Sequence, residues 1–147
     1  MTRVLHLSRQ EAEQYTPAID GICISITDPG APDARLSDRW RAIWRVSFHD
    51  IDALPPDLTG YPPPVLVDQH SAEGIADFIL RHWPLPLIVA HCEAGISRSA
   101  GVVAALNDWM PERLTVIQTG IPNRLVWRLV REALMRRTIA DLAPPTR

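Results

Sequence analysis

One short segment of the chain combines a thiol with a guanidinium group: His91-Cys92-Glu93-Ala94-Gly95-Ile96-Ser97-Arg98-Ser99. An apolar run at 85–90 precedes it, and small and apolar residues continue after it to position 109. This pattern predicts a loop that leaves a buried strand near Cys92 and enters a helix after Arg98. A loop of that kind can enclose a tetrahedral dianion such as a phosphoryl group.

The backbone of this loop is the expected anion-binding surface. In such a turn the N–H groups of residues 93 to 98 can converge on one anion, and the positive end of the following helix adds to the attraction. Glycine in the loop allows a backbone conformation that is costly for other residue types. We therefore expect the phosphoryl oxygens to be bound by Glu93, Ala94, Gly95, Ile96, Ser97 and Arg98.

Side chains of the same segment are candidates for catalysis. The positive field favours the thiolate of Cys92, which is the nucleophilic form. Arg98 carries a planar fork that can bind two phosphoryl oxygens as charge develops. Ser99 can donate a hydrogen bond to the sulfur and ease the departure of the thiolate. The side chain of His91 should point away from the anion, so we expect it to fix the loop rather than transfer protons, with a hydrogen-bonded core histidine as the alternative.

The segment at 91–99 resembles the signature of the protein tyrosine and dual-specificity phosphatases. The likeness extends upstream to VSFHDID (46–52), which is similar to the strand and loop that carry their general-acid aspartate. It extends downstream to IPNRLVWRL (121–129), which is similar to their terminal helix region, so that about residues 20–135 are covered. The resemblance implies a phosphotyrosine phosphatase-like fold and a phosphocysteine intermediate, with no metal and no cofactor.

The resemblance also implies a general acid. One aspartate would protonate the leaving oxygen and then deprotonate the hydrolytic water. Asp50 and Asp52 both lie in the matching segment, and we favour Asp50, while the other aspartate would only cap a turn. Asn123 matches in kind an asparagine of the dual-specificity phosphatases, where it supports the active-site loop.

The predicted function is hydrolysis of a phosphomonoester, with protein phosphotyrosine as the first substrate class. Dual specificity and a small phosphoester stay open as alternatives. Glu93 puts negative charge into the loop, which disfavours inositol phosphates and other polyanions. Two other classes are a pseudophosphatase that only binds phosphorylated partners and a rhodanese-like sulfurtransferase, whose loop is usually shorter.

The elements around the loop alternate between strand and helix patterns. Runs of β-branched and apolar residues predict strands at 2–7, 21–27, 41–48 and 85–90, with the second and third as neighbours in the core. Helices are predicted at 12–15 after a capping box of Ser8 and Glu11, at 71–83 with Ser71 as its cap, and at 99–109, 112–119 and 123–138. The alternation predicts an α/β fold with a central, mostly parallel sheet flanked by helices.

Composition and charge narrow the function classes. The 147 residues suit one domain, which we expect to span residues 1–142, with a flexible tail at 143–147. A net charge of −2 gives no general attraction to nucleic acid or to an anionic membrane, and no apolar stretch is long enough to cross a bilayer.

Cys23 should be a buried hydrophobe, with a redox partnership to Cys92 as the alternative. We expect a cytoplasmic protein with reduced thiols whose partner is its phosphorylated substrate.

Overall fold

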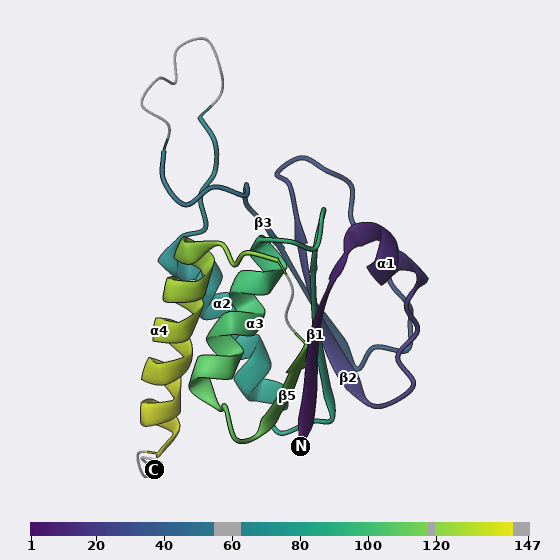
Figure 1. Cartoon of the computed structure of the whole chain (residues 1–147), viewed down its shortest axis with the longest axis vertical. Helices are drawn as coiled ribbons and strands as arrows, with labels where there is room; N and C mark the ends of the chain where they lie inside the picture. Colours follow the sequence, from purple (N-terminus) through teal and green to yellow (C-terminus); the bar gives the residue numbers. More distant parts are fainter. Residues whose placement is uncertain (55–62, 118–119, 143–147) are drawn as a thin grey trace, which may run out of the picture.

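Strands and helices alternate along the chain in the computed structural model, which describes residues 1–54, 63–117 and 120–142 (Figure 1). The described elements are β1 (Thr2–Ser8), α1 (Arg9–Gln14), β2 (Gly21–Thr27), β3 (Ala42–Ser47), α2 (Gln69–His82), β4 (Leu87–Cys92), α3 (Arg98–Trp109), β5 (Leu114–Ile117) and α4 (Arg124–Leu142). The expected tail at 143–147 lies outside the described residues, as do residues 55–62 and 118–119.

All five strands form one parallel sheet in the order β3-β2-β4-β1-β5. The central strand is β4, and its last residue, Cys92, is paired with Ser8 at the end of β1. The α/β class and the parallel sheet are thereby confirmed. β2 and β3 are neighbours as predicted, although β3 lies at an edge of the sheet. Because the strands are parallel, the segments that follow β2, β3 and β4 meet at one end of the sheet.

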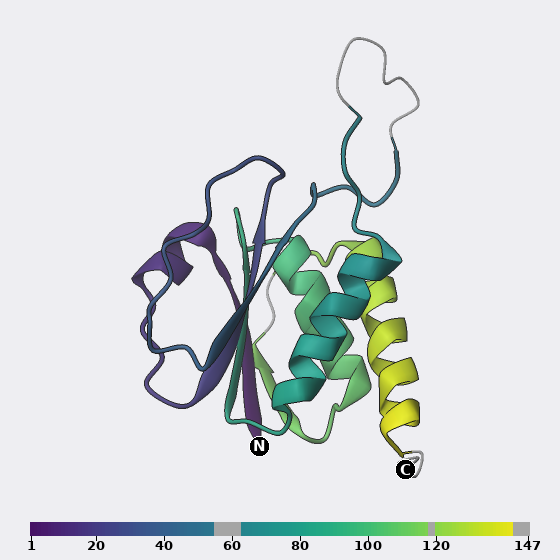
Figure 2. The same cartoon turned by 180° about the vertical axis from the view of Figure 1, so that it is seen from behind.

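The helices cover the two faces of the sheet unequally. Figures 1 and 2 show α2, α3 and α4 on one face and the short α1 with the chain after β2 on the other. The larger core lies under the three helices, and the first nine residues of α3 are all buried there. A smaller cluster on the α1 side contains Cys23, Trp40, Leu87 and Val89. The start of α3 is therefore held between the sheet and α4.

The prediction of a helix at 112–119 is wrong. Residues 114–117 form β5, which pairs with β1 from Thr2↔Leu114 to Leu5↔Ile117, while 118–119 lie outside the described residues. Three of the four residues of β5 are β-branched, which favours an extended backbone. The helix was predicted because proline, here Pro111, is favoured in the first turn of a helix. Tertiary pairing with the open side of β1 outweighs that local preference.

The helix starts were predicted with mixed success. The capping box of α1 is confirmed, because Ser8 Oγ accepts from the Glu11 N–H at 3.1 Å and Glu11 Oε1 accepts from the Ser8 N–H at 2.9 Å. The cap predicted for α2 is wrong: Asp68, not Ser71, is the capping residue, and its Oδ1 accepts the Ser71 N–H at 2.7 Å. Hydrogen bonds from the backbone and from the side chain of Ser71 lower the pKa of Asp68.

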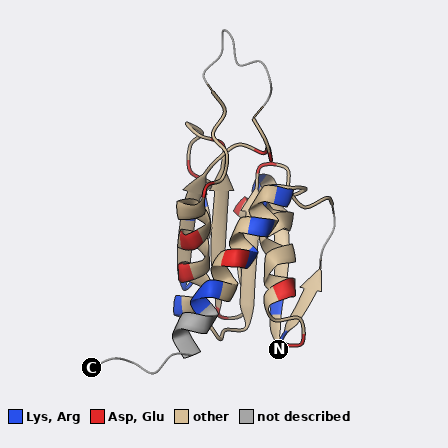
Figure 3. Cartoon of the chain, turned by 90° about the vertical axis from the view of Figure 1, so that its left-hand side faces the viewer, with Lys and Arg blue, Asp and Glu red and all other residues tan. Residues whose placement is uncertain are grey.

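Charged side chains lie on the outer faces of the helices. Figure 3 shows basic and acidic positions interleaved there. Arg131 and Arg137 of α4 pair with Asp108 and Asp77 of the neighbouring helices. In the described part of the chain, no helix combines the length and the apolar character that a membrane span requires.

Candidate active site

Cys92 ends β4 with its sulfur directed at two hydrogen-bond donors. The side chain is buried, with 2% of its surface exposed. Its Sγ lies 3.2 Å from the backbone nitrogen of Gly95 and 3.2 Å from Ser99 Oγ. The Gly95 N–H and the Ser99 hydroxyl can both donate to this sulfur. The predicted contact between Ser99 and the sulfur is present.

The loop after Cys92 can be formed only with glycine at position 95. Gly95 has φ +71°, and a Cβ there would lie 2.4 Å from the backbone nitrogen of Ser8. The loop therefore rests directly on the corner where β1 meets α1. The carbonyl of Gly95 also lies 2.9 Å from His6 Nδ1, which adds a second link to β1.

Arg98 opens α3 and is almost wholly enclosed, with 5% of its surface exposed. Its Nη1 donates to the Asp28 carboxylate at 2.6 Å and to the carbonyl of Phe48 at 2.8 Å. Its Nε is buried and has no hydrogen-bond partner among the described residues. A buried guanidinium N–H without an acceptor is costly. An oxyanion bound inside the loop would supply that acceptor.

Asp28 is a site residue that sequence reasoning missed. It follows β2 directly, and its side chain is 49% exposed beside the buried Arg98. The available signal was its place after a strand that the sequence predicted correctly. The carboxyl ends of neighbouring parallel strands meet, and β2 is the neighbour of β4. The order of the strands, which the sequence did not reveal, was needed to use that signal.

The remaining residues of the loop are half-buried (Glu93 and Ser97) or exposed (Ala94 and Ile96). Ser97 is the N-cap residue of α3 but makes no capping hydrogen bond with its side chain, so the first turn keeps backbone donors for an anion. Ile96 is exposed at 54%. The carboxylate of Glu93 points toward Arg9, with Glu93 Oε1 3.2 Å from Arg9 Nη1, and so does not occupy the anion site.

His91 is fully buried and holds the end of β4, which agrees with the alternative of a core histidine whose ring nitrogens have partners. Its Nε2 lies 2.6 Å from Ser25 Oγ of β2, and its Nδ1 lies 3.4 Å from the carbonyl of Cys92. A carbonyl can only accept, so these partners assign the proton to Nδ1 and make Ser25 the donor to Nε2. Burial lowers the pKa of His91, which keeps the ring neutral.

Asn123 links the loop to the segment that carries the candidate acids. Its backbone N–H donates to the carbonyl of Ser97 at 2.9 Å, and its Nδ2 donates to Asp50 Oδ1 at 3.1 Å and to the carbonyl of Ile51 at 3.2 Å. Asn123 therefore supports the loop, as the sequence predicted, and holds Asp50 beside it.

A cavity of about 290 Å³ adjoins the loop and contains both candidate acids. Its lining includes Asp50 and Asp52 on one side and Ile96 and Ser97 of the loop on the other. Both carboxylates therefore lie beside the part of the loop formed by Ile96 and Ser97, and neither Cys92 nor Arg98 belongs to this lining. Of the two, only Asp50 has the contact with Asn123 described above, so its position is the better defined.

Cys23 lies on the other face of the sheet from Cys92. It is paired with Val89, three residues before Cys92, and successive side chains of a strand alternate between faces. Cys23 accordingly belongs to the cluster on the α1 side, whereas Cys92 belongs to the larger core. Burial raises the pKa of Cys23 to about 12, so this thiol is held neutral. The arrangement argues against a disulfide with Cys92.

A second cavity, of about 360 Å³, lies between β3 and α2 and includes neither Cys92 nor Arg98 in its lining. Two of its charged groups already neutralise each other, because Arg137 Nε lies 2.9 Å from Asp77 Oδ1. Across residues 1–54, 63–117 and 120–142, no group of three or more His, Cys, Asp or Glu side chains is arranged to hold a metal ion.

Comparisons of the chain with protein-family models, with curated proteins and with solved structures gave no match. The functional argument therefore rests on the geometry around Cys92 and Arg98.

Proposed function

We propose that the protein is a cysteine-dependent phosphatase of the phosphotyrosine phosphatase-like fold, which hydrolyses phosphomonoesters at Cys92. The observation that carries the proposal is the enclosed Arg98, whose Nε lacks an acceptor in the described structure and which follows a loop that begins with a buried thiol. Both Gly95 and Ser99 place donors 3.2 Å from that thiol. Nucleophile, anion-binding cation and leaving-group stabiliser thus belong to one short segment.

In the first step, the thiolate of Cys92 attacks phosphorus and forms a phosphocysteine while the ester oxygen leaves. Asp50, held by Asn123, gives that oxygen a proton, so the product departs as a neutral alcohol or phenol. Arg98 and the backbone N–H groups of the loop bind the phosphoryl oxygens as charge develops on them.

In the second step, water hydrolyses the phosphocysteine. Asp50, now a carboxylate, takes a proton from the water as its oxygen attacks phosphorus. The sulfur leaves as a thiolate, which the donors at Gly95 and Ser99 stabilise. The products are inorganic phosphate and the regenerated acid form of Asp50, so the cycle balances without any co-reactant.

The surroundings of the loop favour a singly phosphorylated, partly apolar substrate. Ile96 and Ile121 are 54% and 79% exposed and belong to the lining of the cavity that adjoins the loop, where an aryl ring can pack. The same lining has two carboxylates, Asp50 and Asp52, against the single guanidinium of Arg124. A polyanion would be repelled there, so protein phosphotyrosine is the substrate class that we propose first.

Hydrolysis of an aryl phosphate by chelator-treated protein in the presence of a reductant tests the proposal. Wild-type protein should turn the substrate over, and Cys92→Ser should not, although it should still bind inorganic phosphate. Cys23→Ala is the matched control, because it removes the other thiol on the opposite face of the sheet, and it should keep turnover. Hydrolysis that persists in Cys92→Ser would overturn the mechanism. A wild-type protein that binds phosphate without turnover would instead favour a pseudophosphatase.

A further inference from the structure

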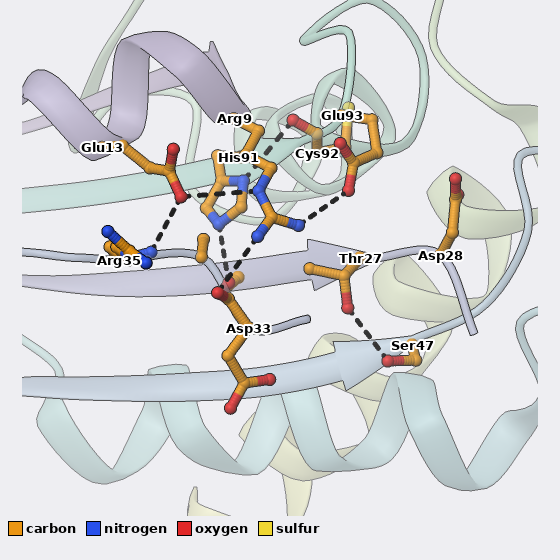
Figure 4. Close-up of polar contacts among 12 residues, drawn as sticks. Arg9, Glu13, Thr27, Asp28, Asp33, Arg35, Ser47, His91, Cys92 and Glu93 are labelled. Atoms are coloured by element: carbon orange, nitrogen blue, oxygen red, sulfur yellow. Dashed lines mark hydrogen bonds and ion pairs between the residues drawn. The ribbon is translucent and has the colours of Figure 1, made fainter. Parts of the chain in front are cut away.

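Arg9, at the first position of α1, contacts two other segments of the chain and its own helix (Figure 4). Its Nη1 donates to Glu93 Oε1 at 3.2 Å, and its Nη2 donates to the carbonyl of Asp33 at 3.0 Å. Its Nε lies 3.5 Å from Glu13 Oε2, one helical turn further along α1. The side chain is 19% exposed, so this guanidinium is largely enclosed by its partners.

Arg9 holds Glu93 at two points. Besides the side-chain contact, the backbone N–H of Arg9 donates to the carbonyl of Glu93 at 3.1 Å. Glu93 is the first loop residue after Cys92, and its own N–H belongs to the expected anion-binding set. Fixing its carbonyl and its carboxylate restricts the rotation of the peptide groups on both sides of it. The backbone contact is independent of the residue type at position 9, so the contribution specific to Arg9 is the restraint that its guanidinium places on the Glu93 carboxylate.

The same guanidinium also holds the segment that begins with Asp28. Asp33 lies in this segment, and further bonds secure its neighbours: Glu13 Oε2 accepts the Arg35 N–H at 2.9 Å, and Arg45 Nη1 donates to the carbonyl of Ala34 at 3.1 Å. Asp28 in turn contacts Arg98. The two polypeptide segments that frame the anion site, the loop and the Asp28 segment, are thus tied to one side chain that lies outside the site.

An isolated surface ion pair would have little effect, because solvent screens it and its side chains lose conformational freedom. Arg9 differs in that its charged, neutral and backbone contacts act together on one rigid corner. The loop already rests on this corner, since Gly95 packs against Ser8. Small displacements of catalytic donors have large effects on rate and on anion affinity.

We propose that Arg9 is a positioning residue for the phosphate-binding loop, acting through Glu93 and through the Asp28 segment. The inference rests on the proposed function for its effect on turnover, but its effect on phosphate affinity is independent of turnover. Arg9→Gln should weaken binding of inorganic phosphate about tenfold and lower kcat/KM for an aryl phosphate by a similar factor.

Phosphate affinity is measured by calorimetry in the Cys92→Ser background, so that chemistry does not contribute. Arg41→Gln is the matched control: Arg41 pairs with Asp20 at the surface, and its loss removes the same charge without touching the loop. Arg9→Lys, which keeps the charge but on a single donor nitrogen, should recover part of the affinity. Phosphate binding by Arg9→Gln that stays within about twofold of the Arg41→Gln value would overturn the proposal.

A charge-balanced double variant separates positioning from simple electrostatics. Arg9→Gln leaves the Glu93 carboxylate unpaired, and this negative charge could repel phosphate by itself. In Arg9→Gln/Glu93→Gln that charge is gone, so an electrostatic cause predicts wild-type affinity, whereas positioning predicts affinity that stays low. Recovery in the double variant therefore contradicts the proposal. Weakened phosphate binding in a protein whose wild type shows no turnover would support Arg9 while removing the phosphatase assignment.

Discussion

Arg98 and Asp28 are 70 residues apart in the sequence, yet Arg98 Nη1 donates to the Asp28 carboxylate at 2.6 Å. The carbonyl of Phe48 accepts from the same nitrogen at 2.8 Å. Together these acceptors fix the plane of the guanidinium from one side. The buried Nε is left for an oxyanion, so the pair orients the cation before a substrate arrives.

Removal of the Asp28 side chain tests this orienting role. Asp28→Ala should lower kcat/KM about tenfold, as expected for the loss of one charge-assisted hydrogen bond at a half-exposed position. Asp28→Asn keeps an acceptor and should lose less. The measurement is steady-state hydrolysis of an aryl phosphate, with Asp33→Ala as a control in the same segment, since only the backbone of Asp33 holds Arg9. Equal activities of Asp28→Ala and Asp33→Ala would show that the ion pair between Asp28 and Arg98 does not contribute to catalysis.

Substitution of the two candidate acids decides which one protonates the leaving group. Asp50→Asn should lower kcat by about a hundredfold or more for a phosphotyrosine peptide, whose phenol is a poor leaving group. The loss should be much smaller for a nitrophenyl phosphate, because its leaving group departs without a proton. Asp52→Asn should show neither effect. The reverse pattern would transfer the role to Asp52.

Ser99→Ala should slow the second chemical step more than the first. The variant removes one of the two donors to the sulfur, so the thiolate becomes a poorer leaving group. We expect kcat to fall about ten- to hundredfold, in line with the loss of a hydrogen bond to a charged group. Rapid-quench kinetics should then show a burst of alcohol product followed by slow turnover. A fall in kcat without a burst would place the role of Ser99 in the first step.

The buried His91 should make stability depend on pH. Its pKa is lowered from 6.5 by burial, so below that value the unfolded chain takes up a proton that the folded chain resists. The free energy of unfolding should therefore fall as pH decreases from about 7.5 to about 5. In His91→Gln this part of the slope should disappear, even though the variant starts from lower stability. Urea unfolding across this pH range measures the free energy of unfolding of the wild type and of His91→Gln. If the two free energies change in parallel with pH, His91 is not the source of the pH dependence.

Local sequence patterns determined most of the secondary structure and the centre of the site. The stretch GICISIT coincides with β2, and the capping box of Ser8 and Glu11 starts α1 as predicted. The order Cys92, Gly95, Arg98, Ser99 between a strand and a helix was sufficient to predict the loop and its contact between Ser99 and sulfur. These features depend on interactions between residues close in sequence, and such interactions require residue types at fixed spacings that can be recognised in the sequence.

Only the tertiary structure decided the rest of the site and one strand. β5 is extended because β1 offers it a partner, which the helix-start signal of Pro111 could not reveal. Asp28 reaches Arg98 because β2 is the neighbour of β4, and Arg9 reaches Glu93 because β1 borders β4 on the other side. Contacts of this kind depend on the order of strands in the sheet. That order is fixed by the packing of the whole chain and has no counterpart in residue spacing.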